Sequence, residues 1–411
     1  MPFFHLPQIV EKVIKVVLIN LTIFLATIPF LAPIPINSDL QYPIYLVCGA
    51  IIFIDILSKK FILSKVEIYF LGLSMLSFFY INPLLEFNLR IPKIVGLLFA
   101  FVVFYVFKRY WRSMNPIYFK FGVYLNLVFI FLEYIQVEFY IKIVSPFVRI
   151  IKLDEGDSDR GFHGLMAEPS FLAGMGAFFF LVSIVLIKEK RISRLSFFLL
   201  FIASFSMMIL SSSITGVIFL AAIFALSLFF INISIINKVI LIFLAIISSF
   251  LLVIVTIEVD LRALDFMRDT IVNPTSILNL NDRSISTRLM ALIGAYESMI
   301  GGHIFGNGVG SLQFVIFDLL RNSKLFSDYL GDHIYFATGY ISAISHYIIE
   351  LGLFFIVFLV WIYSQTRFIS YVISVRLISL LFLLFSFSIL FPPVWILLAI
   401  TDKYNIKKII K

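Results

Sequence analysis

The sequence predicts an all-α fold, a polytopic membrane bundle of about 11–12 transmembrane helices that forms one integral membrane domain over residues 1–411. Composition is the first observation, since 61% of the residues are apolar and 14% are charged, against about 45–50% and about 25% in soluble domains. The second is that apolar runs of ~20 residues, long enough to cross a bilayer, recur along the chain. These features exclude a soluble globular protein and a disordered chain.

The apolar runs place the expected helices in order along the chain. Each spanning segment must be helical, because lipid offers no partner for backbone N–H and C=O groups. Spans are expected near residues 13–32, 42–58, 66–82, 93–107, 117–137, 169–187, 195–211, 214–232, 239–257, 339–363 and 377–391. Residues 377–400 are too few for two full spans and contain Pro392-Pro393, so a kinked pair or a re-entrant hairpin is expected there.

The charge pattern orients this bundle. Lysine-rich clusters between the spans fall on one side, which the positive-inside rule makes the cytoplasm, and the N-terminus lies on that side. The net charge of +8 arises mostly from these clusters and does not indicate a nucleic-acid partner. Acids on the cytoplasmic side are few: Glu11, Asp55, Glu67 and Glu189. No internal repeat is convincing, which argues against an inverted-repeat transporter.

Two longer polar segments, a first outer loop at 138–168 and a large outer loop at 258–338, fall on the other side. Arginine binds phosphate through a planar, bidentate fork, whereas lysine acts as a hydrated point charge. We therefore interpret the cytoplasmic lysines as topology signals and some outer arginines as site residues. The outer arginines are Arg149, Arg160, Arg262, Arg268, Arg283, Arg288 and Arg321.

The first outer loop runs directly into an apolar span. Glu168-Pro169-Ser170 has the pattern of a helix start, so Glu168 and Ser170 have an alternative role as capping residues. Capping does not account for Arg160 and His163 just upstream. An arginine and a carboxylate held at the membrane surface could orient a phosphate and a sugar hydroxyl, which makes Arg160, His163 and Glu168 candidate site residues.

The large outer loop is too long for a passive connection, because structureless loops beyond about 12–15 residues are uncommon unless they are functional. After Ser286 and Thr287, apolar residues recur at helical spacing and predict an amphipathic helix on or near the membrane surface. Its apolar residues are Leu289, Leu292, Ile293, Tyr296 and Ile300. Arg288 would lie in its first turn and is a candidate site residue, with Arg283 as the alternative. Either could instead be a surface arginine paired with Asp282 or Glu297.

A glycine-rich stretch follows the predicted helix. Gly301-Gly302 should end the helix, and Gly306, Gly308 and Gly310 should form a loop with little side-chain bulk. Such a loop lets backbone N–H groups approach an anion, although a plain helix stop also accounts for it.

Among the ionisable residues within expected spans, where such groups are costly and usually face a cavity, His346, Glu350 and Glu133 are candidates for function. His346 and Glu350 are four residues apart and share one helix face, so Glu350 could fix the tautomer of a histidine base. The same spacing is a weak metal-ligand pattern without a third ligand nearby, and no metal is expected. His333 is a second candidate base. Glu133 could pair with a basic group or snorkel to the surface.

These motifs resemble those of Wzy-type O-antigen and exopolysaccharide repeat-unit polymerases, which belong with the O-antigen ligases. The resemblance comprises R-x-x-x-G-L-x-x-E-P-S from Arg160 to Ser170, Arg288 followed by F-G-x-G at Phe305, and H-x-x-x-E-L-G-L at His346. It implies a GT-C-like bundle in the bacterial inner membrane. It also implies a glycosyltransferase that moves a growing glycan from undecaprenyl pyrophosphate to a lipid-linked repeat unit, without a cofactor.

The resemblance also implies residue roles. Arg160 and Arg288, with Arg283 in reserve, would hold the pyrophosphate, His346 or His333 would accept the hydroxyl proton, and Glu168 would orient the loop or the acceptor. His163, Gly306, Gly308 and Glu350 complete the candidate site. The expected partners are the undecaprenyl-pyrophosphate-linked oligosaccharide and the bilayer, and a chain-length regulator is left open.

Other functions stay open at this point. An O-antigen ligase that passes the glycan to lipid A-core would share the fold and chemistry. A transporter for the same lipid-linked glycans would want charged cavities between helices, whereas this chain gathers its polar residues in two outer loops. No Walker sequence and no G-x-G-x-x-G after a strand is present, which disfavours a cytoplasmic nucleotide-sugar enzyme.

Overall fold

The computed structural model describes residues 8–34, 42–81, 87–148, 161–230, 283–321, 323, 342–365, 369–384 and 390–402. Within these ranges the regular secondary structure is all helical. Extended backbone segments pair only at two isolated β-bridges. The helices are α1 (Gln8–Leu25), α2 (Pro43–Leu57), α3 (Lys65–Phe79), α4 (Phe87–Tyr110), η1 (Trp111–Ser113), α5 (Pro116–Ile135), α6 (Val137–Val144), α7 (Pro169–Lys188), α8 (Arg194–Leu210), α9 (Ile214–Phe230), α12 (Arg283–Ile300), α13 (Leu312–Arg321), α15 (Ala343–Leu351), α16 (Leu353–Ser364), α17 (Ser370–Leu384) and α18 (Pro392–Ile400).

Most expected spans coincide with a helix, because an apolar run is bounded by good capping residues. Ser64 and Glu67 form a capping box at the start of α3, Asn115 caps α5 ahead of a proline, and Ser193 caps α8. Of the described helices, α5 and α7 are long and apolar enough to cross a membrane by length and composition. The segment 239–257 lies outside the described residues.

Three expected spans end early or are interrupted. The segment 13–32 is helical only to Leu25, ahead of Pro29 and Pro33, and Leu31 then forms a bridge with Val148. The described part of the segment 339–363, from Ser342 onward, forms two helices, α15 and α16, that meet at Gly352. The segment 377–391 contains the later part of α17 and Phe391, the N-cap of α18, while residues 385–389 lie outside the described residues. Helices α17 and α18 pack against each other as a helical hairpin, and its re-entry from one side of a membrane stays a prediction.

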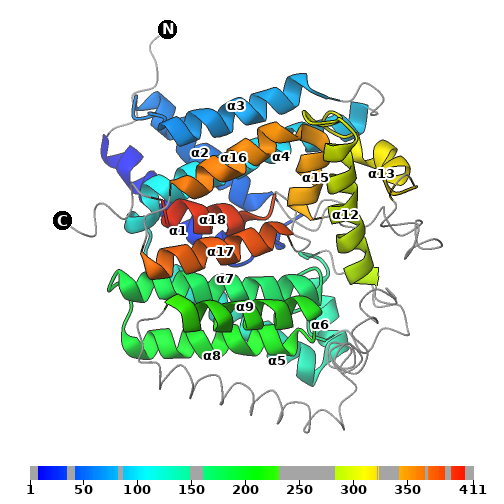
Figure 1. Cartoon of the computed structure of the whole chain (residues 1–411). Coiled ribbons are helices and arrows are strands. Elements are labelled where there is room, and N and C mark those ends of the chain that lie inside the picture. The colour runs from blue at the N-terminus through cyan, green and yellow to red at the C-terminus, as the bar shows by residue number, and fades with distance from the viewer. Residues whose placement is uncertain are drawn as a thin grey trace, which may run out of the picture.

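Helix α18 lies in the middle of the bundle, packed against α4, α7 and α17 (Figure 1). All nine of its residues are buried, which a nine-residue helix with two prolines achieves only inside protein. At ~1.5 Å per residue it is ~14 Å long. Lys108, near the end of α4, lies 3.7 Å from Asp402. The chain has therefore turned back after α17 and brought residues 401–402 to the end of the bundle where α4 finishes.

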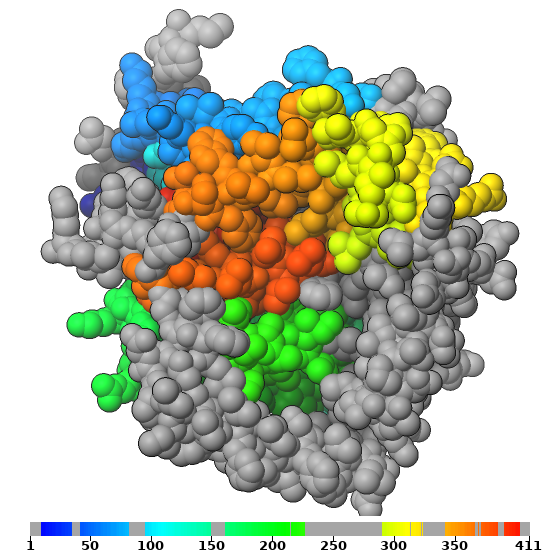
Figure 2. Space-filling view, viewed as in Figure 1, coloured from blue at the N-terminus to red at the C-terminus, as the bar shows by residue number. Residues whose placement is uncertain are grey.

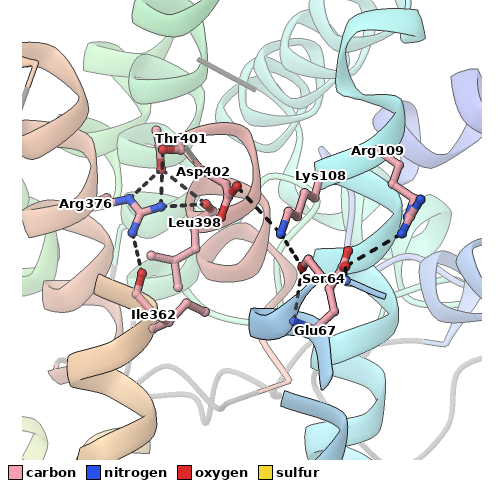
Figure 3. A network of polar contacts seen from close by, with 9 residues as sticks. All are labelled: Ser64, Glu67, Lys108, Arg109, Ile362, Arg376, Leu398, Thr401 and Asp402. Atoms are coloured by element: carbon pink, nitrogen blue, oxygen red, sulfur yellow. Dashed lines mark hydrogen bonds and ion pairs between the residues drawn. The ribbon is translucent and has the colours of Figure 1, made fainter. Parts of the chain in front are cut away.

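A buried arginine holds this hairpin in place. The Arg376 side chain, 2% exposed, donates to the carbonyl oxygens of Ile362 at the end of α16 and of Leu398 and Thr401 at the end of α18, and also to the Thr401 hydroxyl (Figure 3). The last carbonyls of a helix have no partner within the helix. One guanidinium therefore satisfies the C-terminal ends of two helices.

The four acids expected on the cytoplasmic side all pair with bases expected on that side. The ion pairs are Glu11–Lys60 (3.1 Å), Asp55–Lys15, Glu67–Arg109 (3.8 Å) and Glu189–Arg191 (3.4 Å). Asp55 also accepts from the Tyr105 and Tyr110 hydroxyls, and Glu189 accepts from the Trp111 indole, so residues 105–111 connect the pairs. These groups share one end of the bundle, hereafter the polar end.

Two basic residues at the polar end need a fuller interpretation than topology signals. Lys108, 5% exposed, donates to the Ser64 hydroxyl over 2.8 Å and faces Asp402 (Figure 3). Lys15 is half-buried, pairs with the buried Asp55 and lies over the Tyr110 ring. These side chains therefore connect helices through buried and part-buried polar contacts.

Replacement of Arg376 tests the anchoring of the α17–α18 hairpin. Arg376→Leu should destabilise the protein by about 3–5 kcal/mol, because it leaves buried carbonyl oxygens without donors. The buried thiol of Cys48, the single cysteine, reports unfolding through reaction with a maleimide dye during heating in detergent. Arg194→Leu, at an exposed arginine, is the matched control, and equal melting of the two variants would contradict the role of Arg376.

Candidate functional site

The predicted site residues fall into three groups. Arg160 and His333 lie outside the described residues. Arg283 and Arg288 lie on α12, which begins at Arg283 rather than after Thr287, so Arg288 is in its second turn; their side chains are outside the description. The described candidates are His163, Glu168, Gly306, Gly308, His346 and Glu350.

Glu133 of α5 organises the first outer loop. Its carboxylate accepts from the backbone N–H groups of His163 (2.9 Å) and Gly164 (2.9 Å), and lies 3.0 Å from the His163 Nδ1. Both side chains are buried, at 5% and 3% exposed. Glu133 therefore pairs with a basic group and does not snorkel. His163 is enclosed by this contact. Its role in substrate binding stays a prediction.

Glu168 lies at the start of the long apolar helix α7. It occupies the N-cap position ahead of Pro169, as the capping alternative predicted, but its side chain caps no backbone N–H. Its Oε2 instead accepts from the Ser170 hydroxyl over 3.2 Å. Glu168 is half-buried, which leaves the carboxylate within reach of solvent at the end of α7 opposite the polar end.

Helix α12 lies across the ends of the long helices, beside α13 and α15 (Figure 1). A face of small and flexible residues, Met290, Ala291, Gly294, Ala295 and Ser298, is buried. The predicted apolar residues Leu292, Tyr296 and Ile300 are 40%, 55% and 62% exposed. In the space-filling view α12 forms a ridge next to α15 and α16 (Figure 2). The helix thus packs by close approach and presents its large apolar side chains outward.

The loop after α12 closes the break between α15 and α16. Gly352 adopts φ +54° and ψ −130°, and the Leu353 N–H donates to the Ile304 carbonyl (2.7 Å) rather than within the helix. In exchange, the Ile349 and Glu350 carbonyls accept from the N–H groups of Asn307 (2.9 Å) and Gly308 (3.0 Å). We call this arrangement of residues 303–309 on residues 349–353 the glycine clasp.

The glycine clasp also joins the end of α3. Tyr80 donates through its hydroxyl to the Gly306 carbonyl (3.1 Å) and accepts through its own carbonyl from the Val309 N–H (2.7 Å). Gly306 itself has φ +84°. A Cβ at this position would lie 2.5 Å from the Glu350 carbonyl carbon, so only glycine allows the approach.

These contacts correct the predicted use of the glycine loop. The N–H groups of residues 306, 307, 308 and 309 all donate to carbonyl oxygens of this chain, so they do not form a cradle for an anion. The loop also does more than end helix α12. Gly306 and Gly308 permit two backbones to touch, and they supply the partners that a broken helix lacks.

His346 and Glu350 form the one predicted pair that can be checked in full. The His346 Nε2 lies 2.8 Å from the Glu350 Oε1, as the i, i+4 spacing predicts. The His346 side chain is 19% exposed and that of Glu350 is fully buried. A buried carboxylate against one ring nitrogen orients the imidazole, which is an arrangement suited to a general base.

Sequence reasoning missed the residues that hold this site together. Asn307, Tyr80 and His163, the partner of Glu133, contact residues that lie 30 or more positions away in the sequence. Hydrophobic periodicity does not predict contacts over such separations. The one local signal was Asn307 between two glycines, a turn pattern. Within the described ranges, no group of three His, Cys, Asp or Glu residues is arranged to hold a metal ion.

Comparison of this chain with protein-family models, with curated proteins and with solved structures finds no match.

Two glycines provide a matched test of the glycine clasp. Gly302 and Gly306 have similar φ values of +89° and +84°, but a Cβ at Gly302 meets nothing within 4 Å. Alanine should cost about 1–2 kcal/mol at either position through backbone strain. Gly306→Ala should cost clearly more, because the clasp must separate. Thermal unfolding reported by Cys48 measures both, and equal losses would argue against a close backbone approach.

Proposed function

We propose that this chain is a polytopic inner-membrane glycosyltransferase that polymerises a glycan from lipid-linked repeat units on the outer face. The observation that carries the proposal is the pairing of the partly accessible His346 with the buried Glu350. The pair belongs to α15, whose last residues meet the end of α3 through the glycine clasp, opposite the polar end. Glu168 and the motif that resembles Wzy-type polymerases begin α7 at the same end.

The exposed side chains support a lipid environment. Large apolar residues are well exposed on α2, α3, α5, α8 and α16, including Leu46 (63%), Phe79 (80%), Phe131 (64%), Leu195 (68%) and Val360 (65%). A monomeric soluble protein rarely exposes contiguous apolar patches above a few hundred Å². Acyl chains are the natural neighbours of such faces, and α5 and α7 have the length and composition to cross a bilayer.

The chemistry follows from the groups at that end. A hydroxyl of the lipid-linked acceptor unit attacks the anomeric carbon of the growing glycan, and the bond from that carbon to the pyrophosphate oxygen breaks. The pyrophosphate leaves with the electron pair, and His346, oriented by Glu350, takes the hydroxyl proton. Arg160 and Arg288, with Arg283 in reserve, would stabilise the charge on the leaving group. His333 remains the alternative base.

The orientation of both outer loops is directly testable. Alkaline phosphatase fused after residue 157 or after residue 330 should be active, whereas green fluorescent protein at either position should be dark, because both loops are proposed to lie outside the cytoplasm. A fusion after residue 190, in the turn between α7 and α8 at the polar end, should give the reverse pattern. Active phosphatase at 190 together with inactive phosphatase at 157 would invert the orientation and remove the donor from the proposed site.

The reaction class is tested by glycan ladders from a deletion strain. Single-repeat products should accumulate, because acceptor units are still made and exported but not joined. Arg160→Lys and Arg288→Lys should each reproduce that pattern at normal membrane abundance, since lysine cannot form the bidentate fork. Arg194→Lys, at an exposed position of the polar end, is the control and should keep long chains. Unattached long chains would instead identify a ligase, and precursors retained in the cytoplasm a transporter.

A further inference from the structure

One side chain of the glycine clasp connects the helix of the predicted arginines to the helix of the predicted base. The Asn307 Nδ2 donates to the Ser298 hydroxyl of α12 (3.0 Å) and to the Ile349 carbonyl of α15 (3.0 Å). The Asn307 backbone N–H donates to the same Ile349 carbonyl over 2.9 Å. A primary amide has two N–H groups on one nitrogen, so it can bridge two acceptors at once.

One acceptor adjoins a predicted site residue, and the other lies on the helix that carries the predicted arginines. Ile349 immediately precedes Glu350 on α15, and Ser298 is fully buried on the packed face of α12. Arg288 lies ten residues before Ser298 on the same helix, ~15 Å along its axis at ~1.5 Å per residue. The two hydrogen bonds of the Asn307 side chain therefore restrain the position of α12 along α15.

We propose that Asn307 is a positioning residue that sets the His346–Glu350 pair relative to the arginines of α12. This inference rests on the proposed function, in which the arginines hold the leaving pyrophosphate and His346 takes the acceptor proton. Reacting groups must be held to well within an ångström, so a shift of α12 against α15 slows the chemical step more than it weakens binding. Asn307 acts through its two contacts and does not touch the substrate.

The test uses the full-length protein and two readouts. Asn307→Asp keeps the shape and removes both amide donors, Asn307→Ala removes the side chain, and Ser298→Ala removes one acceptor. His303→Ala, at an exposed residue of the same loop, is the matched control. The first readout is polymerisation with purified lipid-linked repeat units. The second is the rate of carbethoxylation of His346 by diethyl pyrocarbonate, followed by peptide mass spectrometry, which needs no enzymatic activity.

The expected result separates positioning from folding. Both Asn307 variants should lower kcat by about tenfold or more with little change in KM, because two part-buried hydrogen bonds are lost. Ser298→Ala should give a smaller loss, and His303→Ala none. Modification of His346 should be several-fold faster in the Asn307 variants. In a His346→Ala background, Asn307→Ala should cause no further loss, since a residue that acts through His346 has nothing left to position.

Two results overturn the inference: unchanged modification of His346 in both Asn307 variants, or a further loss of the same size in the His346→Ala background. A different result tests the proposed function alone. If His346→Ala retains full polymerisation, His346 is not the base. Faster modification of His346 in the Asn307 variants would still support positioning of the pair by Asn307.

Discussion

Satisfaction of backbone hydrogen bonds at interrupted helices is the constraint on which this structure depends. The helix over α15 and α16 breaks at Gly352, which leaves the Ile349 and Glu350 carbonyls without their usual donors. Residues 303–309 supply those donors. At the polar end, Arg376 supplies donors to carbonyl oxygens in the last turn of α16 and at the buried end of α18. A buried unpaired carbonyl is costly, so each break requires a dedicated partner from a distant part of the chain.

The regular parts of the fold were predictable because their signals are local. The runs 42–58, 169–187 and 195–211 became α2, α7 and α8 within one residue at each end. A continuous apolar sequence with a capping residue or proline at its start predicts a helix and the residue at which the helix begins. The break at Gly352 was not predictable, since Gly352 lies in apolar sequence and hydropathy has no signal for a bond made to residue 304. The arrangement of the short buried helix α18 was left undecided for the same reason, because hydropathy has no signal for its contacts with distant helices.

The candidate site divides in the same way. The His346–Glu350 contact follows from helix geometry alone, and the structure has it at 2.8 Å. The role of Gly306 and Gly308 was wrong in mechanism, because glycine serves close contact with backbone as readily as contact with an anion. Glu133 and His163 are 30 residues apart, and their pairing depends on how α5 and the first outer loop pack. Tertiary packing decides such contacts, and no spacing rule encodes them.

The place of α18 in the chain has a consequence for biosynthesis. Its nine buried residues fill the space between α4, α7 and α17, yet it is translated after all three. The inward faces of those three helices therefore stay uncovered until α18 has been made. Assembly of the centre is therefore a late event, completed when Asp402 leaves the ribosome and reaches Lys108. A chain that ended before α18 would leave the buried faces of α4, α7 and α17 without the helix that packs between them.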